Sequence, residues 1–275
     1  MKDAPESTKA KTNTAKSTKA AKAKPSKSSK PLAKRKSAGR LKSKFLDAYY
    51  GHPLKDMKLI CITGTTGKSI VAHFVHQILN EAGQRVAVLA SDAEIKTGVL
   101  HKFFSDAWKV GANYVVVTAP AESIARNAFY GLPVHCAALT DFVPAGLETP
   151  SAEEYLAAES TLFSMEPDLV ILNRDDAHYD TFKAFAGRMA TVTYGSDQFC
   201  DLRIDSSKLY KKGCEAHLNL NGTRFTVASF LPGEPVVHYM ACAAAIATAL
   251  HIAPDPIEAG IAAYAPEEEK PAEEK

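Results

Sequence analysis

The chain has 275 residues, of which 46% are hydrophobic, so it can build an ample core in one large domain or two small ones. Its net charge of +2 hides an asymmetry: residues 1–44 carry 15 Lys and Arg against two acidic residues, and the remainder carries 18 basic and 29 acidic residues. Five scattered cysteines, the lack of a membrane-length apolar run and the lack of a signal core argue against disulfide-framework, membrane and secreted classes, and predict a cytoplasmic protein without membrane contact.

The first 44 residues are mostly Lys, Ala, Ser, Thr and Pro. Such a segment buries too little apolar surface to offset its ordering entropy, so we expect residues 1–44 to be a disordered basic tail. Two roles stay open for it: contact with nucleic acid or another polyanion, or a solubilising extension of an acidic domain. No aromatic residue interleaves the basic run, so stacking on single-stranded bases is not indicated.

A short helix is expected from Phe45 to Tyr50, and then comes the most informative stretch of the chain. Leu59–Ile62 is apolar and leads into the loop Thr63–Ser69, TGTTGKS, after which apolar residues recur at helical spacing. A buried strand, a glycine turn and a helix form the setting of a phosphate-binding loop, although the full pattern would place Gly at position 62. On this reading Lys68 faces phosphate and Ser69 can hold Mg²⁺. The alternative is an ordinary strand-to-helix turn with a chance lysine.

Strands and helices then alternate as far as residue 194. We expect strands at 85–90, 114–118, 134–140, 169–172 and 190–194, and helices at 101–110, 122–129, 151–165 and 179–186. Ser151 and Glu154 have the spacing of a capping box. The alternation predicts an α/β fold with a doubly wound, mainly parallel sheet, whose ligands sit at the carboxyl ends of the strands. Asp92 and Glu94 follow the second strand at that edge, where they could touch a substrate.

The pattern changes after residue 200. Segments 201–209, 215–220 and 224–230 alternate polar and apolar residues, with an Asn221-Gly222 hairpin signal, and predict a small antiparallel meander. An Ala-rich helix at 235–250 and a short helix at 255–264 follow. We therefore expect one domain over residues 45–264 and an acidic disordered tail over residues 265–275.

Five segments carry a family resemblance through their order: ITGTTGKS at 62–69, TDFVPAGLE at 140–148, YLAAESTLF at 155–163, NRDD at 173–176 and the Ala-rich helix. They resemble I-T-G-T-x-G-K-T, T-N-L-x-P-E-H-L-E, Y-x-x-A-K-x-x-L-F, N-x-D-D and the helix after H-N-x-x-N in the central ATP-binding domain of the Mur ligases. The muramyl-tripeptide synthetases are the most similar branch, and folylpolyglutamate synthases are related. The resemblance covers residues 45–264.

The resemblance implies an ATP-dependent carboxylate–amine ligase of peptidoglycan precursor synthesis, which forms an acyl phosphate that an amino acid's amine attacks. It implies that Lys68 is catalytic and that Gly64, Thr65, Thr66, Gly67, Lys68 and Ser69 bind the ATP phosphates. Asn173, Asp176 and His238 are expected on the adenosine side. The implied partners are ATP with Mg²⁺, a UDP-muramyl-peptide and an amino acid.

The sequence departs from the family at the metal ligands. Thr118 stands where the family has a metal-binding Glu, Gly146 where it has a His, and Glu159 where it has a carbamylated Lys. The two adenine-side asparagines become His238 and Ala241. In place of the family's ligands, we expect oxygen atoms of Glu122 or Glu159, together with Ser69, to bind Mg²⁺. Other nearby carboxylates stay open as further ligands.

The family's flanking domains have no counterpart in this sequence, so a partner chain that supplies them is one expectation. Three functional hypotheses stay open. The first is an active ligase, and the second is a nucleotide-binding pseudoenzyme or partner subunit. In the third, the basic tail acts on a polyanion.

Overall fold

The computed structural model describes residues 32–143 and 151–264. The elements in chain order are α1 (Leu32–Tyr49), the short 3-10 helix η1 (Pro53–Lys55), β1 (Lys58–Thr63), α2 (Lys68–Glu81), β2 (Val86–Leu89), α3 (Thr97–Lys109), β3 (Tyr114–Thr118), α4 (Ala121–Ala125), β4 (Val134–Leu139), α5 (Ala152–Phe163), β5 (Leu169–Asn173), α6 (Tyr179–Ala186), β6 (Ala190–Gly195), β7 (Leu202–Tyr210), β8 (Gly213–Leu220), β9 (Thr223–Ser229), α7 (Glu234–Ala249) and α8 (Pro254–Ala263).

The strands form one sheet of nine in the order β2-β3-β1-β4-β5-β6-β7-β8-β9. Pairing is parallel from β2 through β7 and antiparallel from β7 to β9. The predicted α/β class, with a mainly parallel sheet and an antiparallel meander, is confirmed. The meander is continuous with the main sheet, because Tyr194 of β6 pairs with Leu202 of β7. The Asn221-Gly222 turn joins β8 to β9, with Leu220 opposite Thr223.

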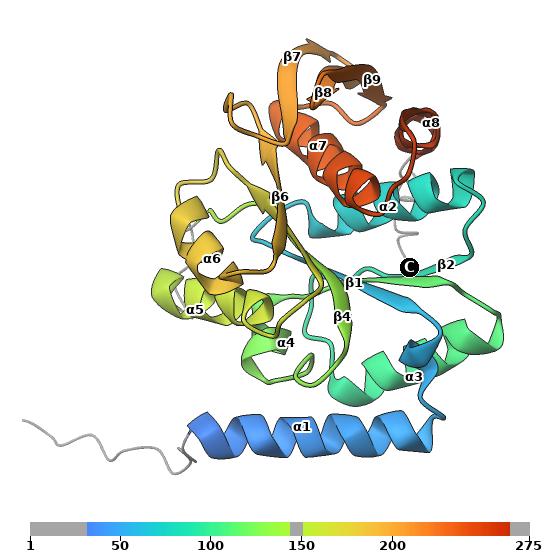
Figure 1. Ribbon diagram of the computed structural model, residues 1–275, viewed down its shortest axis with the longest axis vertical. Coiled ribbons are helices and arrows are strands. Elements are labelled where there is room, and N and C mark those ends of the chain that lie inside the picture. The colour runs from blue at the N-terminus through green and yellow to red at the C-terminus, as the bar shows by residue number, and fades with distance from the viewer. Residues whose placement is uncertain (1–31, 144–150, 265–275) are drawn as a thin grey trace, which may run out of the picture. The chain divides into compact units, whose positions relative to one another are not determined.

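Two hydrophobic cores cover the two faces of the sheet. Because side chains alternate along a strand, Ile60 and Ile62 of β1 enter one core while Leu59 and Cys61 enter the other. Helices α2, α7 and α8 cover the first face and α3 to α6 cover the second, as Figure 1 shows. With both faces covered, β1 is apolar throughout its interior, which is typical of parallel strands.

The position of β1 explains where a site can form. Its neighbours in the sheet are β3 and β4, both parallel to it. The chain leaves β1 towards α2 on one face and leaves β4 towards α5 on the other, so the carboxyl ends of β1 and β4 form a topological switch point. The backbone N–H of Thr140 donates to the carbonyl of Thr63 at 3.0 Å, which draws the two loops together at this edge.

The predicted boundary between tail and domain is wrong for residues 32–44, because α1 begins at Leu32. Low apolar content suggested disorder there, but Ala, Leu, Lys and Arg are also strong helix formers. A tertiary contact anchors the helix: Ser43 is buried, and its hydroxyl lies 3.1 Å from Nε2 of His101 in α3. Residues 1–31, the remainder of the predicted basic tail, lie outside the described residues, as does the acidic tail 265–275, and the polyanion contact stays a prediction.

Other element boundaries differ modestly from expectation. The helix expected at 101–110 begins at Thr97, and the one expected at 122–129 spans only Ala121–Ala125. The capping box at α5 is present as predicted, since Ser151 accepts the N–H of Glu154 and Glu154 accepts the N–H of Ser151. Within residues 32–143 and 151–264, no helix is long and apolar enough to cross a membrane.

Candidate functional site

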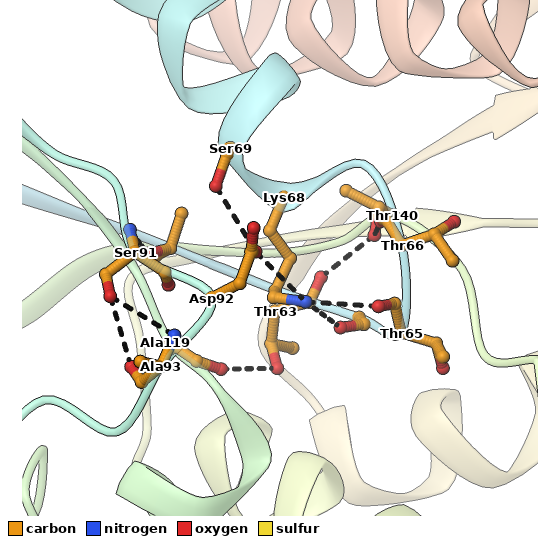
Figure 2. A network of polar contacts seen from close by, with 12 residues as sticks. Thr63, Thr65, Thr66, Lys68, Ser69, Ser91, Asp92, Ala93, Ala119 and Thr140 are labelled. Atoms are coloured by element: carbon orange, nitrogen blue, oxygen red, sulfur yellow. Dashed lines mark hydrogen bonds and ion pairs between the residues drawn. The ribbon is translucent and has the colours of Figure 1, made fainter. Parts of the chain in front are cut away.

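The loop between β1 and α2 is the centre of the candidate site. Lys68 is the first residue of α2 and is 7% exposed, and its Nζ donates to the carbonyls of Gly64 at 2.9 Å and Thr65 at 3.1 Å (Figure 2). The ammonium group therefore lies over the loop at the N-terminus of a helix, where backbone N–H groups and the helix dipole favour an anion.

Two glycines in the loop are required because neighbouring residues pack closely against the loop backbone. Gly64 has φ +134°, and a Cβ there would lie 2.1 Å from Oγ1 of Thr140. Gly67 has φ +72°, and a Cβ there would lie 2.2 Å from the ring of Tyr239. Both positions thus need a residue without a side chain, for conformational and for steric reasons.

The segment after β4 holds the loop in shape. Thr66 donates its backbone N–H to Oδ1 of Asp141 at 2.8 Å and its hydroxyl to Oδ2 of the same carboxylate. The N–H of Thr65 donates to the Asp141 carbonyl at 3.0 Å, and the Thr140 hydroxyl donates to the Thr66 carbonyl at 2.6 Å. Tyr239 of α7 adds a contact of 2.7 Å between its hydroxyl and that of Thr66. The loop is preformed by groups far from it in sequence.

A cavity of about 430 Å³ lies on the β4–β5 side of the loop. Its lining includes the three residues predicted on the adenosine side, Asn173, Asp176 and His238, so the structure brings them together. Tyr239 and Asp175 line it as well. Sequence reasoning did not single these two out, because Tyr239 lies in an Ala-rich helix without a motif of its own and Asp175 was only one letter of N-x-D-D.

Backbone contacts fix these lining residues. Asn173 Nδ2 donates to the carbonyl of Thr140 at 3.3 Å, and its Oδ1 accepts the N–H of Asp175 at 3.0 Å. Asp176 accepts the N–H of Phe142 at 2.5 Å and that of His178 at 2.7 Å. His238 lies 3.2 Å from the carboxylate of Asp175 through Nε2. Asn173 and Asp176 therefore shape the cavity wall, and His238 is the more accessible group for a flat ligand.

A second cavity of about 280 Å³ lies on the other side of the loop. Its lining comprises Gly64, Thr65, Thr66, Gly67, Lys68, Asp92, Pro120, Ala121, Glu122 and Tyr155. Glu122, a predicted metal ligand, accepts the Tyr155 hydroxyl at 2.5 Å, and this hydrogen bond is the main reason that the pKa of Tyr155 rises to about 12. Ser69, also predicted to bind metal, donates its hydroxyl to Asp92 Oδ1 at 3.3 Å.

Glu159, the third predicted metal ligand, is fully buried in α5. In the described part of the chain neither of its carboxylate oxygens has a hydrogen-bond partner. Burial raises the pKa of Glu159 to about 8; nearby Lys68 acts in the opposite direction, and Asp141 and Asp176 raise it further. At neutral pH this side chain is therefore mostly a neutral acid.

The burial of Glu159 predicts a pH dependence of stability. The unfolded carboxyl ionises near its ordinary pKa of 4.5, whereas the folded one keeps its proton up to about pH 8. The unfolded state thus binds fewer protons in this window, so the free energy of unfolding falls as pH rises from about 4.5 to about 8. Glu159→Gln should flatten this decline. The loss of unfolding free energy that it removes is up to several kcal/mol, because one pKa unit is worth about 1.4 kcal/mol.

Urea unfolding at pH 5, 6.5 and 8 measures the effect. Glu153→Gln, at an exposed position of the same helix, is the matched control and should keep the wild-type slope. Parallel curves for wild type and Glu159→Gln would contradict the burial argument.

The structure places only some of the predicted metal ligands near the loop. Within residues 32–143 and 151–264, no three His, Cys, Asp or Glu side chains form a group that could hold a metal ion by themselves. Ser69 and Glu122 face the loop region, but Glu159 does not line the cavity. Positions 146 and 148 lie outside the described residues. A cation here would need phosphate oxygens to complete its ligands, which is the usual situation for Mg²⁺.

Comparison with known proteins gives one family. The model of the Mur ligase middle domain matches residues 62–247. The UDP-N-acetylmuramoyl-L-alanyl-D-glutamate–2,6-diaminopimelate ligase of Listeria monocytogenes is 27% identical over 245 residues, covering 81% of this chain and 50% of the relative. The chain thus spans about half the length of the curated relatives that it matches.

Solved structures show the same fold. A UDP-N-acetylmuramoyl-L-alanyl-D-glutamate–2,6-diaminopimelate ligase superposes with a TM-score of 0.73 at 20% identity, over 82% of this chain and 49% of the other. Folylpolyglutamate synthase from Mycobacterium tuberculosis, solved with ADP and AMPPCP, has a TM-score of 0.68 at 14% identity, over 84% and 66% of the two chains. These likenesses concern the fold.

Proposed function

This chain belongs to the Mur ligase family through its middle domain, and from that premise we propose that it binds ATP with Mg²⁺ on the loop from Gly64 to Ser69. The observation that carries the proposal is the buried Lys68 ammonium at the start of α2, with a cavity on each side of its loop. The adenosine would occupy the cavity of Asn173, Asp176 and His238, and the phosphates would lie over the loop amides.

The supported activity is ATP-dependent amide-bond formation on a peptidoglycan precursor. In the proposed reaction a substrate carboxylate oxygen attacks the γ-phosphorus and ADP leaves; an uncharged amine then attacks the acyl carbon, phosphate leaves, and the amine nitrogen loses one proton to solvent. Lys68 stabilises charge on the transferred phosphoryl group. When bound, Mg²⁺ neutralises phosphate charge. Ser69 beside Asp92 and Glu122 in the cavity lining would offer oxygens for it, and Glu159 would have to lose its proton and reorient to join them.

The names of the relatives suggest the substrates. UDP-N-acetylmuramoyl-L-alanyl-D-glutamate would supply the carboxylate and 2,6-diaminopimelate the amine. We propose the cavity beside the loop, lined by Glu122 and Tyr155, as the place of the carboxylate, with Lys68 and the bound cation offsetting its acidic lining.

One observation favours a second candidate, a protein that binds nucleotide without turnover. Thr118 stands where the family places a metal-binding Glu, and its hydroxyl is engaged with the backbone of Ser91. A domain that keeps the loop and lacks this ligand could hold ATP as a regulatory or partner subunit.

Two measurements on the full chain separate these functions. Calorimetric titration with a non-hydrolysable ATP analogue, with and without Mg²⁺, tests binding. ADP release with the UDP-muramyl dipeptide and 2,6-diaminopimelate, against reactions lacking either one, tests turnover. The ligase proposal predicts ADP release that requires both substrates. Binding without release supports the second candidate, and absence of binding in all conditions refutes both.

A further inference from the structure

The Thr118 side chain at the carboxyl end of β3 is engaged with the backbone of the segment after β2. Thr118 is fully buried; its hydroxyl donates to the Ser91 carbonyl at 2.8 Å and accepts the Ser91 N–H at 2.8 Å. A hydroxyl has one proton and two lone pairs, so this double contact commits the proton and one of the lone pairs. The same contact fixes the backbone of Ser91, the residue directly before Asp92.

Asp92 is also held by contacts between the residues on either side of it, Ser91 and Ala93. The Ser91 hydroxyl lies 3.2 Å from the Ala93 N–H and 3.3 Å from the Ala93 carbonyl, so a local turn encloses Asp92 (Figure 2). Its carboxylate reaches across to the loop of β1: Oδ1 accepts the Ser69 hydroxyl at 3.3 Å and lies 3.8 Å from Lys68 Nζ. An exposed side chain from the segment after β2 thus meets both functional groups at the start of α2.

The charges around the second cavity call for a cation. Lys68 contributes one positive charge to its lining, whereas Asp92 and Glu122 contribute two carboxylates. A third carboxylate, Asp141, lines the other cavity and accepts the N–H of Thr66 in the loop. A triphosphate that entered alone would meet this surplus of negative charge at short range, with water screening part of the repulsion at Asp92, whose side chain is 74% exposed. A divalent cation held by the carboxylates and phosphate oxygens removes the conflict.

We propose that Asp92 is the principal carboxylate ligand of the divalent cation in this site, in place of the β3 position that Thr118 occupies. The inference rests on the proposed nucleotide function and assigns a role to a residue outside the five segments of family resemblance. Asp92 already contacts the Ser69 hydroxyl, the loop group suited to Mg²⁺. Glu122 is a weaker candidate because Tyr155 binds its Oε1, and Glu159 because it is fully buried and does not line the cavity.

The test measures affinity for a non-hydrolysable ATP analogue by calorimetry, with Mg²⁺ and with EDTA, for wild type and Asp92→Asn. The expected result is a loss of about tenfold or more in the Mg²⁺-dependent gain of affinity, a loss typical of damage to a metal's surroundings. Affinity in EDTA should stay equal or rise, because a repelling charge is gone. Electron paramagnetic resonance of Mn²⁺ gives a second readout: Asp92→Asn should release bound Mn²⁺ from the nucleotide complex.

Glu94→Gln is the matched control. This residue lies two positions along the same segment, and its carboxylate pairs with Arg126 at 3.3 Å, away from the loop. It should retain the wild-type Mg²⁺ effect. If Asp92→Asn retains it as well, the inference is overturned; a loss in Glu122→Gln would then place the cation on Glu122. If wild type binds no nucleotide under either condition, the proposed function and the inference both fall. Circular dichroism should show all variants folded.

Discussion

Lys68→Ala is expected to weaken binding of ATP and ADP by about 10- to 100-fold, the effect of losing charge-assisted hydrogen bonds worth roughly 1.5–3 kcal/mol. The reason lies in the position of the side chain. Its Nζ is held over the loop by the carbonyls of Gly64 and Thr65, and it is buried, so little solvent screening weakens its attraction for phosphate. Calorimetric titration with each nucleotide in Mg²⁺ measures the change.

A lysine elsewhere on the domain supplies the control. Lys102 lies on the exposed side of α3 and pairs with Asp106, so Lys102→Ala should leave nucleotide affinity unchanged. Wild-type affinity in Lys68→Ala would mean that phosphate does not contact this loop. The result would refute the proposed nucleotide site as a whole and not only the role of the lysine.

A large effect on stability is expected from a substitution at Gly260 in α8. This helix crosses α2, and a Cβ at Gly260 would lie 2.4 Å from Cα and 2.5 Å from N of Ile78. Because both are backbone atoms, no rotamer change relieves the overlap, and the two helices must separate. Gly260→Ala should therefore lower the free energy of unfolding by about 3 kcal/mol, the upper part of the range for overpacked cores. The melting temperature should fall by roughly 6–12 °C.

Gly98→Ala in α3 serves as the comparison for Gly260→Ala. Gly98 is also a helical glycine, but a Cβ there meets no atom within 4 Å. Gly98→Ala should raise the unfolding free energy by about 0.5 kcal/mol, because alanine loses less backbone entropy in a helix. Urea unfolding of the two variants checks the pair. Equal effects of the same sign would show that the α2–α8 contact is looser than described.

The local parts of the fold were predictable because their signals lie within a few residues. The loop Thr63–Ser69 follows an apolar run and precedes a helical repeat, and Ser151 and Glu154 form their capping box across three residues. The Asn221-Gly222 dipeptide likewise predicts the hairpin between β8 and β9. In each case a short-range steric or hydrogen-bonding preference agrees with the final fold, which is why pattern reasoning succeeds there.

The contacts that complete the site depend on distant parts of the chain. The hydroxyl of Thr66 meets that of Tyr239, 173 positions later, and the carboxylate of Asp92 reaches the loop from the segment after β2. Only the strand order brings these groups together, and a single sequence carries no pattern for it. The start of α1 was missed for a related reason: the buried contact of Ser43 with His101 joins residues 58 positions apart.

Asp141 occupies a loop donor that a phosphate could use. Its carboxylate accepts the N–H of Thr66, so on the proposed function a phosphate that bound this N–H would exchange with a tethered carboxylate, whose effective concentration does not depend on the nucleotide supply. Such an exchange would lower the net gain from binding, since one favourable contact replaces another, and it would favour release of the nucleotide.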